Sequence, residues 1–469
     1  MCLNNKILKM KKTHIILVAI ILVISSCQVT KNYQSPELRN EALYREYSRQ
    51  DSNTVARIHW KEFFTDEYLQ QLIGQALNEN LDLKMAMERI NAANAYFKQS
   101  KLAFYPDLNA GASVTQSKLA FPQGFGLINN STQYDLHLSS SWEADIWGKL
   151  KSNKKAALAS LLQTEAAKRT IQSQLIADIA FYYYNLMALD NQLDILEQTL
   201  ENRKEEVAAM KDLKAANVVN GAAVVQSEAN QYTVEVAIPD VKKEIRETEN
   251  MISFLIGSPS ETINRKSLGD YLIPDQLSVG IAAQLLQYRP DIQTAELNFR
   301  IAFEQTNVAR TAFYPNLRIT AGTGFSSLDF AKWFTADGLF ANIMGGITQP
   351  IFNKGLNKAN LAAAQAKQEE ALHNFRKSML NAGKEVSDAL FALNTAKEKE
   401  VSRVKQLESL NKAVDFTKEL LRYTETTNYT DVLTSEQNLL NAEIEMVNDR
   451  LEQWLSIIAL YKATGGGAQ

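Results

Sequence analysis

The sequence is poor in the residues that build most catalytic and metal centres. Its 469 residues include only two cysteines, Cys2 and Cys27, and four scattered histidines without an HExxH spacing. Two cysteines near one end exclude a disulfide scaffold and a thiolate metal site. No GxxxxGK[ST] phosphate loop and no GxSxG nucleophile elbow occurs. We therefore expect neither an enzyme nor a bound cofactor or metal ion.

An excess of positive charge is also missing. Lys and Arg total 50 against 53 Asp and Glu, and four of the lysines lie in residues 1–26, which hold no acid. A nucleic-acid partner is not expected, because its phosphates require a basic surface. The 45% hydrophobic content and 9% aromatic content are typical of an ordered protein.

The first residues have the layout of a secretory signal. Lysines precede an apolar run over 15–24, which is too short to span a bilayer and ends in Ser-Ser-Cys27. The four residues that end at Cys27 resemble the bacterial lipobox, whose cysteine is acylated. We predict a signal peptide over 1–26 and lipidation at Cys27; the alternative is a leader followed by a free cysteine. Gln28, rather than aspartate, follows the cysteine and favours an outer-membrane address.

The chain contains an internal duplication. Residues 82–106 align without a gap with residues 291–315, and both copies end in Ala-Phe-Tyr-Pro. Further along, Ser227-Glu228 matches Ser435-Glu436. Self-similarity over this distance indicates one fold unit written twice. We predict an N-terminal segment over 27–65, a first repeat over 66–257, a linker over 258–290, a second repeat over 291–464 and a tail over 465–469.

Each repeat contains a long tract that favours helices. Proline is absent from 123–238 and 351–469, so we expect uninterrupted helices there and prolines at the seams. Apolar residues recur seven apart in both tracts: Ile179, Leu186, Leu193, Leu200 and Val207, with the companion row Leu175, Tyr182, Leu189 and Leu196, and then Leu372, Met379, Val386, Leu393, Leu407, Val414 and Leu421. A period of 3.5 predicts supercoiled helices. We place helical hairpins at about 150–256 and 355–464.

Four other segments alternate between apolar and polar residues. They predict strands at about 107–121, 132–145, 316–328 and 339–352, each long enough to cross a bilayer when tilted. Arg318 lies on the polar side, where a wet lumen would accept it. Aromatic residues flank the segments: Tyr105, Phe121, Trp142, Trp147, Tyr314 and Phe352. Alternation alone also fits a soluble sheet with one wet face.

If these strands lie in a membrane, one chain is not enough. Four strands cannot close a barrel, and open sheet edges are not tolerated in lipid. We therefore predict that several copies of the chain share one barrel and one ring of helices.

Together these features resemble the TolC-like family of outer-membrane efflux proteins, most closely its OprM-like lipoprotein branch. The resemblance is carried by five segments in order along the chain: Trp60 to Leu83, Trp142 to Lys149, Leu286 to Glu296, Ala309 to Leu317, and Thr348 to Phe352. It implies a mixed α+β membrane protein, a homotrimer whose 12-stranded β-barrel takes four strands from each chain. A long coiled-coil α-helical barrel would project into the periplasm, wrapped by an equatorial region formed from residues 28–65, 258–290 and the tail.

The resemblance also implies a function and partners. Such a chain is the passive exit duct of a tripartite efflux pump for drugs or other small solutes. Its partners would be an inner-membrane RND-type transporter, a periplasmic adaptor, outer-membrane lipid and its own copies. The rival interpretation is a lipid-tethered coiled-coil scaffold that conducts nothing.

Candidate functional residues lie where the long helices turn back, at about 214–222 and 423–430. By resemblance, Asp431 matches an aspartate ring at the periplasmic constriction, with Tyr429 and Arg422 beside it; Thr434 stands where a second ring would be. Asp431 fits equally well as an acid in the first turn of a helix capped by Asn428. Arg422 likewise fits a gate ion pair or a plain cation at a helix C-terminus.

The first turn has ordinary turn residues. We expect Asn217, Asn220 and Gly221 to reverse the chain, with Gly221 supplying a positive φ. By resemblance these residues, together with Thr426 and Asn428, would also dock the adaptor.

Overall fold

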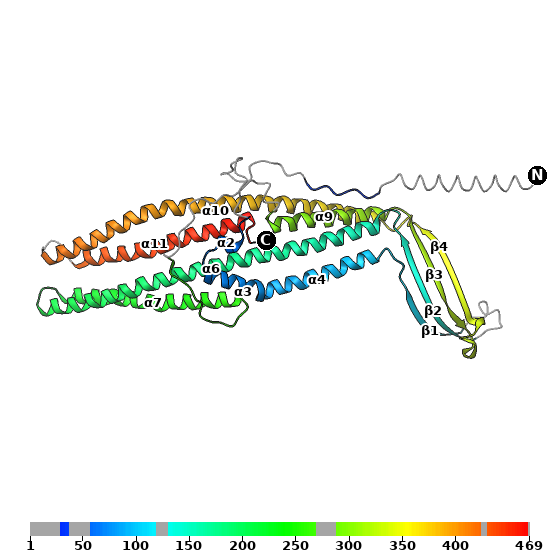
Figure 1. The fold of residues 1–469 in the computed structure, drawn as a ribbon, viewed down its shortest axis with the longest axis horizontal. Coiled ribbons are helices and arrows are strands. Elements are labelled where there is room, and N and C mark those ends of the chain that lie inside the picture. The colour runs from blue at the N-terminus through cyan, green and yellow to red at the C-terminus, as the bar shows by residue number, and fades with distance from the viewer. Residues whose placement is uncertain (1–28, 37–56, 119–129, 269–287, 424–428, 468–469) are drawn as a thin grey trace, which may run out of the picture. The chain divides into compact units, whose positions relative to one another are not determined.

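The computed structural model describes residues 29–36, 57–118, 130–268, 288–423 and 429–467 and divides into two compact units (Figure 1). Unit 1 draws on residues 1–37, 90–164 and 295–375, and unit 2 on the remainder. Each unit thus takes matching parts from both repeats. Four helices contribute to both units: α4 (Leu81–Leu102), α6 (Lys149–Ala215), α9 (Pro290–Thr311) and α10 (Leu356–Tyr423). None of the helices described has both the length and the apolar character needed to cross a bilayer.

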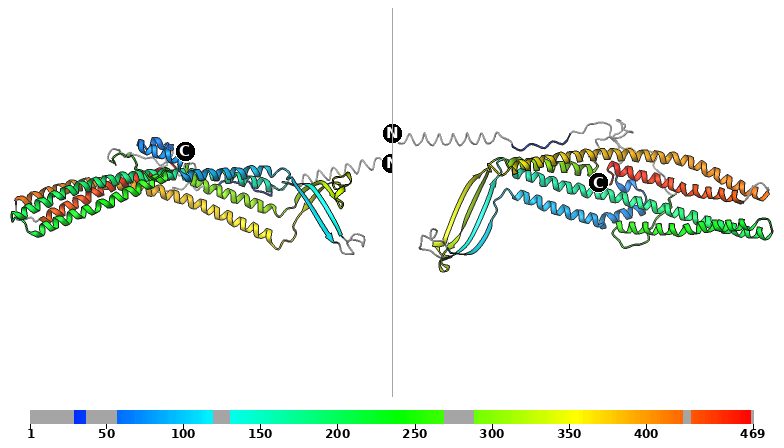
Figure 2. Two further views of the ribbon diagram at one scale, coloured as in Figure 1. Left: turned by 90° about the horizontal axis from the view of Figure 1, so that it is seen from below. Right: turned by 180° about the vertical axis from the view of Figure 1, so that it is seen from behind.

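Unit 1 contains one antiparallel sheet in the order β1-β2-β3-β4 (Figure 2). The strands span Asn109–Lys118, Asn130–Ala144, Asn316–Ser327 and Leu339–Thr348. Strand β4 ends earlier than predicted, since Pro350 has no N–H to donate to a ladder. Short 3₁₀ helices at Phe330–Lys332 and Ala336–Gly338 join β3 to β4.

The register gives this sheet one apolar and one largely polar face. Residues directly opposite each other on neighbouring strands share a face. On the apolar face, Trp142 of β2 pairs with Ile319 of β3. On the other side Glu143 pairs with Arg318, as the alternation predicted. Isoleucines of the apolar face are open to solvent in the single chain: Ile343 is 78% and Ile347 72% exposed.

Unit 2 is built on two long helical hairpins, α6 with α7 (Gly221–Leu255) and α10 with α11 (Tyr429–Thr464). The predicted heptad positions that the structure describes are buried or half-buried, which confirms the 3.5 period. Pro239 is a difference, because it lies inside α7 and not at a seam. Its neighbours Val234 and Ile238 are buried against Leu196 and Leu440, and this packing offsets a loss of about 3 kcal/mol for a proline inside a helix.

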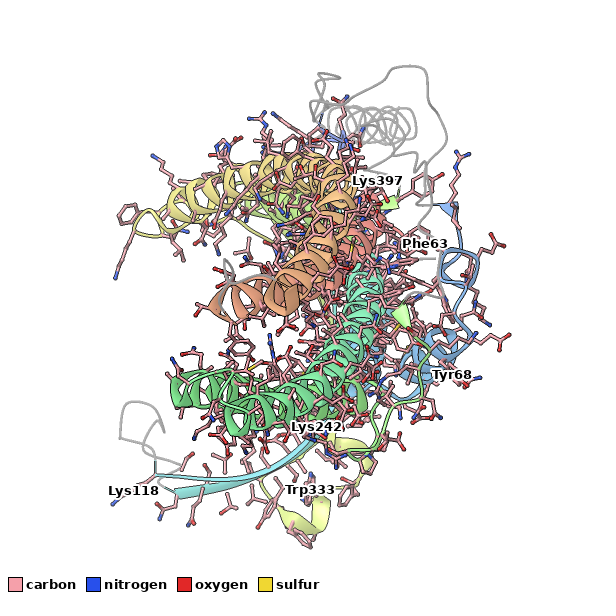
Figure 3. The ribbon with its side chains drawn as sticks, turned by 90° about the vertical axis from the view of Figure 1, so that its left-hand side faces the viewer. Phe63, Tyr68, Lys118, Lys242, Trp333 and Lys397 are labelled. Atoms are coloured by element: carbon pink, nitrogen blue, oxygen red, sulfur yellow. The ribbon has the colours of Figure 1, made fainter. Side chains whose placement is uncertain are left out.

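One apolar cluster, which we call the base core, joins the hairpins to the short helices α2 (Trp60–Phe63) and α3 (Glu67–Glu79). Tyr184 stacks on Trp454 with ring centroids 4.5 Å apart. The ring of Phe63, labelled in Figure 3, stacks on Tyr461 at 4.1 Å. Asp66 caps α3 and accepts a 2.7 Å hydrogen bond from the buried Tyr183 hydroxyl.

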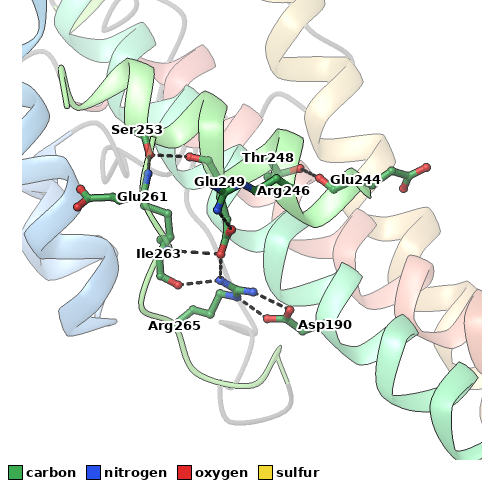
Figure 4. A network of polar contacts seen from close by, with 9 residues as sticks. All are labelled: Asp190, Glu244, Arg246, Thr248, Glu249, Ser253, Glu261, Ile263 and Arg265. Atoms are coloured by element: carbon green, nitrogen blue, oxygen red, sulfur yellow. Dashed lines mark hydrogen bonds and ion pairs between the residues drawn. The ribbon is translucent and has the colours of Figure 1, made fainter. Parts of the chain in front are cut away.

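The segment that follows α7 is pinned by a guanidinium group (Figure 4). Arg265 donates to both carboxylate oxygens of Asp190 on α6, at 2.5 and 2.8 Å. It also donates to Glu249 on α7 at 2.7 Å and to the Ile263 carbonyl oxygen. Bidentate pairing of this kind fixes orientation as well as charge, so the linker is tied to both helices of the first hairpin.

Candidate functional site

The candidate site is the part of unit 2 where both hairpins turn, and we call it the hairpin ends. Helices α6, α7 and α11 meet there around a small apolar cluster of Met210, Val224, Tyr429, Val432 and Leu433. The cluster ties the hairpins together within one chain, since apolar side chains buried in common stabilise by roughly 1.5–3 kcal/mol each.

The turn between α6 and α7 is closed by asparagines. The amide of Val218 donates to the Leu213 carbonyl and that of Asn217 to the Lys214 carbonyl, which is a Schellman ending. Asn217 takes the positive φ of 57° that this ending needs. The Asn220 side chain then caps α7 by accepting from the Ala223 amide at 3.1 Å.

This turn corrects one prediction. Gly221 does not have a positive φ; it is the first residue of α7. The left-handed position falls four residues earlier, on Asn217, whose short polar side chain tolerates it. A Cβ added at Gly221 would meet Lys214 at 3.7 Å, an ordinary contact, so the position has room for a side chain.

Tyr429 connects the two hairpins through its hydroxyl. It begins α11, is 8% exposed and donates to Ser227 Oγ on α7 at 3.0 Å in a buried contact. Burial raises the pKa of Tyr429. The phenol therefore stays protonated and keeps its donor role.

Beside this pair lies an ionic cluster of four side chains, Arg203 and Glu206 on α6, Lys418 on α10 and Glu436 on α11. Arg203 Nη1 donates to Glu206 Oε2 at 2.9 Å and also to Glu436 Oε2. Lys418 Nζ lies 2.7 Å from Glu436 Oε1 and 3.9 Å from Glu206 Oε1. The Arg203 side chain is only 4% exposed, so the guanidinium is desolvated and depends on its carboxylates.

The two carboxylates of this cluster differ in proton affinity. Burial, the hydrogen bond with Glu436 and the charge of Glu436 raise the pKa of Glu206 to about 7. Burial alone would also raise the pKa of Glu436. Hydrogen bonds from Glu206 and Lys418 and the nearby positive charges outweigh it and lower that pKa. The proton that the pair binds thus resides mainly on Glu206 and is lost as the pH rises through about 7.

The other predicted site residues are placed as follows. Asp431 lies in the first turn of α11 and is exposed, and Thr434 one turn later is exposed too. Arg422 belongs to the last turn of α10, and nothing is described of its side chain. Thr426, Asn428 and the lipidation candidate Cys27 lie outside the described residues.

The ionic cluster was not among the predicted site residues, because acids interspersed with lysines along a helix are typical of a solvated face. A signal for it exists. Arg203 falls seven residues after Leu196 and so continues the companion heptad row Leu175, Tyr182, Leu189 and Leu196. A charge in an apolar row predicts a buried, paired ion.

Comparisons with known proteins agree with this architecture. The family described as outer membrane efflux protein matches residues 72–258 and 281–466. SilC of Salmonella typhimurium, a probable outer membrane lipoprotein, is 27% identical over 464 residues, 98% of this chain and 99% of that protein. SepC of Pseudomonas putida, a probable efflux pump outer membrane protein, is 30% identical over 471 residues, 97% of each.

A crystal structure of CusC shares the fold. It has a TM-score of 0.84 and 28% identity, and the match covers 94% of this chain and 100% of that one. The resemblance and the mixed fold of helices with a small sheet are thereby confirmed. The chain belongs to the outer membrane efflux protein family.

Proposed function

We propose that this chain assembles with two further copies into the outer-membrane exit duct of a tripartite efflux pump. The observation that carries this is the sheet of unit 1. Its apolar face is exposed, and within the described residues strands β1 and β4 each pair along one edge only. Further copies would pair these edges and complete a 12-stranded barrel with lipid around the apolar face.

The decisive experiment is conductance. Purified full-length protein reconstituted into planar lipid bilayers should open water-filled channels, and cross-linking should report trimers. A lipid-tethered scaffold would insert without conducting. Absence of current from protein that is trimeric and folded would contradict the duct.

The hairpin ends are the proposed meeting point with the periplasmic adaptor, and an inner-membrane transporter would complete the pump. Asn217, Asn220 and Gly221 form the first turn, with Thr426 and Asn428 assigned to the second. Because Gly221 has room for a Cβ, Gly221→Phe should leave trimers intact while abolishing drug export from cells. Loss of trimers together with export would favour a purely structural turn.

We further propose that Asp431, with Tyr429 and Arg422 nearby, forms the constriction at this end. Asp431 is exposed in the first turn of α11, so its carboxylates from three copies could approach one axis. Like charges close together favour cations. Asp431→Asn should therefore lower the cation preference of the conductance, and an unchanged preference would argue against a ring.

The address of the protein follows the family, whose members are outer-membrane efflux proteins. We propose that residues 1–26 are removed, that Cys27 is lipidated, and that the helices project into the periplasm. SilC, the relative described as a lipoprotein, supports this assignment. Palmitate labelling of the wild type, but not of Cys27→Ser, would test it.

A further inference from the structure

The ionic cluster at the hairpin ends joins helices from both hairpins in a buried place. The Arg203 and Glu436 side chains are 4% and 10% exposed, and that of Glu206 is 17% exposed. We propose that Glu206 and Glu436 share one proton and form a pH-sensitive joint between the two hairpins of one chain. The joint holds while the proton is present and loosens when it leaves.

The geometry places both carboxylates on one guanidinium group. One guanidinium nitrogen, Arg203 Nη1, donates to an oxygen of each carboxylate, so the two acids converge on a single donor. The other cation, Lys418, is half exposed, and it lies nearer to Glu436, at 2.7 Å, than to Glu206, at 3.9 Å. When both acids are ionised, two buried negative charges therefore compete for one fully buried positive charge.

Among the residues that the structure describes, the ion pairs of Glu206 and Glu436 are made with Arg203 and Lys418 alone. Tyr429 on α11 feels the charges of the cluster and bonds to Ser227 on α7, and Lys211 on α6 has its own partner, Glu228 on α7. Lys211 is engaged by Glu228 at 2.9 Å. The Tyr429 hydroxyl is engaged by Ser227, and burial keeps it neutral.

The direction of the effect follows from proton linkage. The pKa of Glu206 is raised from 4.5 to about 7 in the folded chain. Its stabilising contribution is therefore complete below the unfolded value and is lost as the pH rises through about 7. The hairpin ends should accordingly be held together in a mildly acidic periplasm and looser in a mildly alkaline one.

The test uses the full-length protein in detergent and hydrogen exchange of α11 amides near Tyr429, corrected for intrinsic exchange rates. In the wild type, protection should fall as the pH rises toward about 7, by at most about tenfold for each pH unit, the limit for one proton, and should level off above it. Glu206→Gln keeps a hydrogen-bond donor toward Glu436 without a titratable proton. It should hold the joint closed and remove the pH dependence between about pH 6 and about pH 8, on either side of the pKa.

Two further variants show whether the pH response belongs to the Glu206 and Glu436 pair. Glu201→Gln is the matched control, since Glu201 is an exposed acid on the same helix, and it should behave like the wild type. Glu436→Gln removes the neighbouring charge, so the response should move below this pH range. Amides around Tyr183 in the base core report whether each variant is folded. Wild-type protection that is flat across the range, or a response retained in Glu206→Gln, would overturn the proposal.

Discussion

Unit 2 holds its hairpins together in two different ways. At the base core, aromatic and aliphatic side chains such as Tyr183, Tyr184 and Trp454 are buried in one continuous cluster. At the hairpin ends the shared apolar cluster is small, and a buried ionic cluster lies beside it. Apolar burial does not depend on pH, whereas paired charges do. The same two hairpins are thus joined by pH-independent apolar packing at the base core and by pH-dependent ion pairs at the hairpin ends.

Tyr184→Ala, in the base core, is expected to have the largest effect on stability. The ring stacks on Trp454 and its side chain is 2% exposed, so truncation leaves a cavity in the base core. Truncating a large buried aromatic residue costs about 3–5 kcal/mol. We expect a marked fall in the denaturation midpoint, measured by circular dichroism, at every pH. Phe181→Ala on the same helix, where the ring is 41% exposed, should have a much smaller effect. Equal effects would deny that the base core is the main fastening.

Arg203→Met tests how much the ionic cluster stabilises the hairpin ends. Removing one partner of a buried ion pair costs about 3–5 kcal/mol, because the remaining charges are left uncompensated. Here Glu206 and Glu436 would keep only Lys418. We expect the loss to be local, with faster hydrogen exchange at the ends of α6 and α11 and unchanged protection at the base core. Lys204→Met, which removes an exposed pair with Glu201, is the control and should change little.

The sequence predicted those structural features that leave a periodic pattern of apolar residues along the chain. Periodicity located the sheet and the hairpins closely, since β3 was expected at 316–328 and spans Asn316–Ser327. It also assigned Arg318 to the correct face of β3. These features repeat along the chain and are set by burial of one face, which local pattern reports well.

Other features of the structure were not predicted from the sequence. The pairing of Arg203 with Glu436 joins positions 233 apart, and the place of Arg203 in an apolar heptad row indicates burial but not which acid it pairs with. The positive φ was assigned to Gly221 because glycine is the usual choice, but the Schellman geometry placed it on Asn217. Pro239 was expected at a seam, and packing on both sides kept it inside α7. For the ion pair and Pro239, tertiary contacts decided the outcome, whereas the turn at Asn217 was set by local hydrogen bonds.

Asn220→Ala gives a smaller effect confined to the ends. The side chain caps α7 through the Ala223 amide, and loss of such a cap costs about 0.5–2 kcal/mol. We expect faster exchange in the first turn of α7 and no change at the base core. Asn220→Asp retains a capping oxygen and should preserve most of the protection. If the aspartate variant were as impaired as the alanine variant, the side chain would be acting through something other than the cap.

Tyr429→Phe is expected to have the smallest effect. It separates the contribution of one buried hydrogen bond from that of apolar packing at the hairpin ends. The substitution keeps the ring in the apolar cluster and removes only the hydroxyl that donates to Ser227. A net loss of about 0.5–1.5 kcal/mol is expected for one buried hydrogen bond. In a double-mutant cycle with Ser227→Ala the two losses should be less than additive, because both variants delete the same bond. The exposed Thr430→Val, which leaves this bond in place, serves as the control. Full additivity of Tyr429→Phe and Ser227→Ala would show that the hydroxyl pair does not couple α7 to α11, leaving the ionic cluster and the apolar side chains to join the hairpin ends.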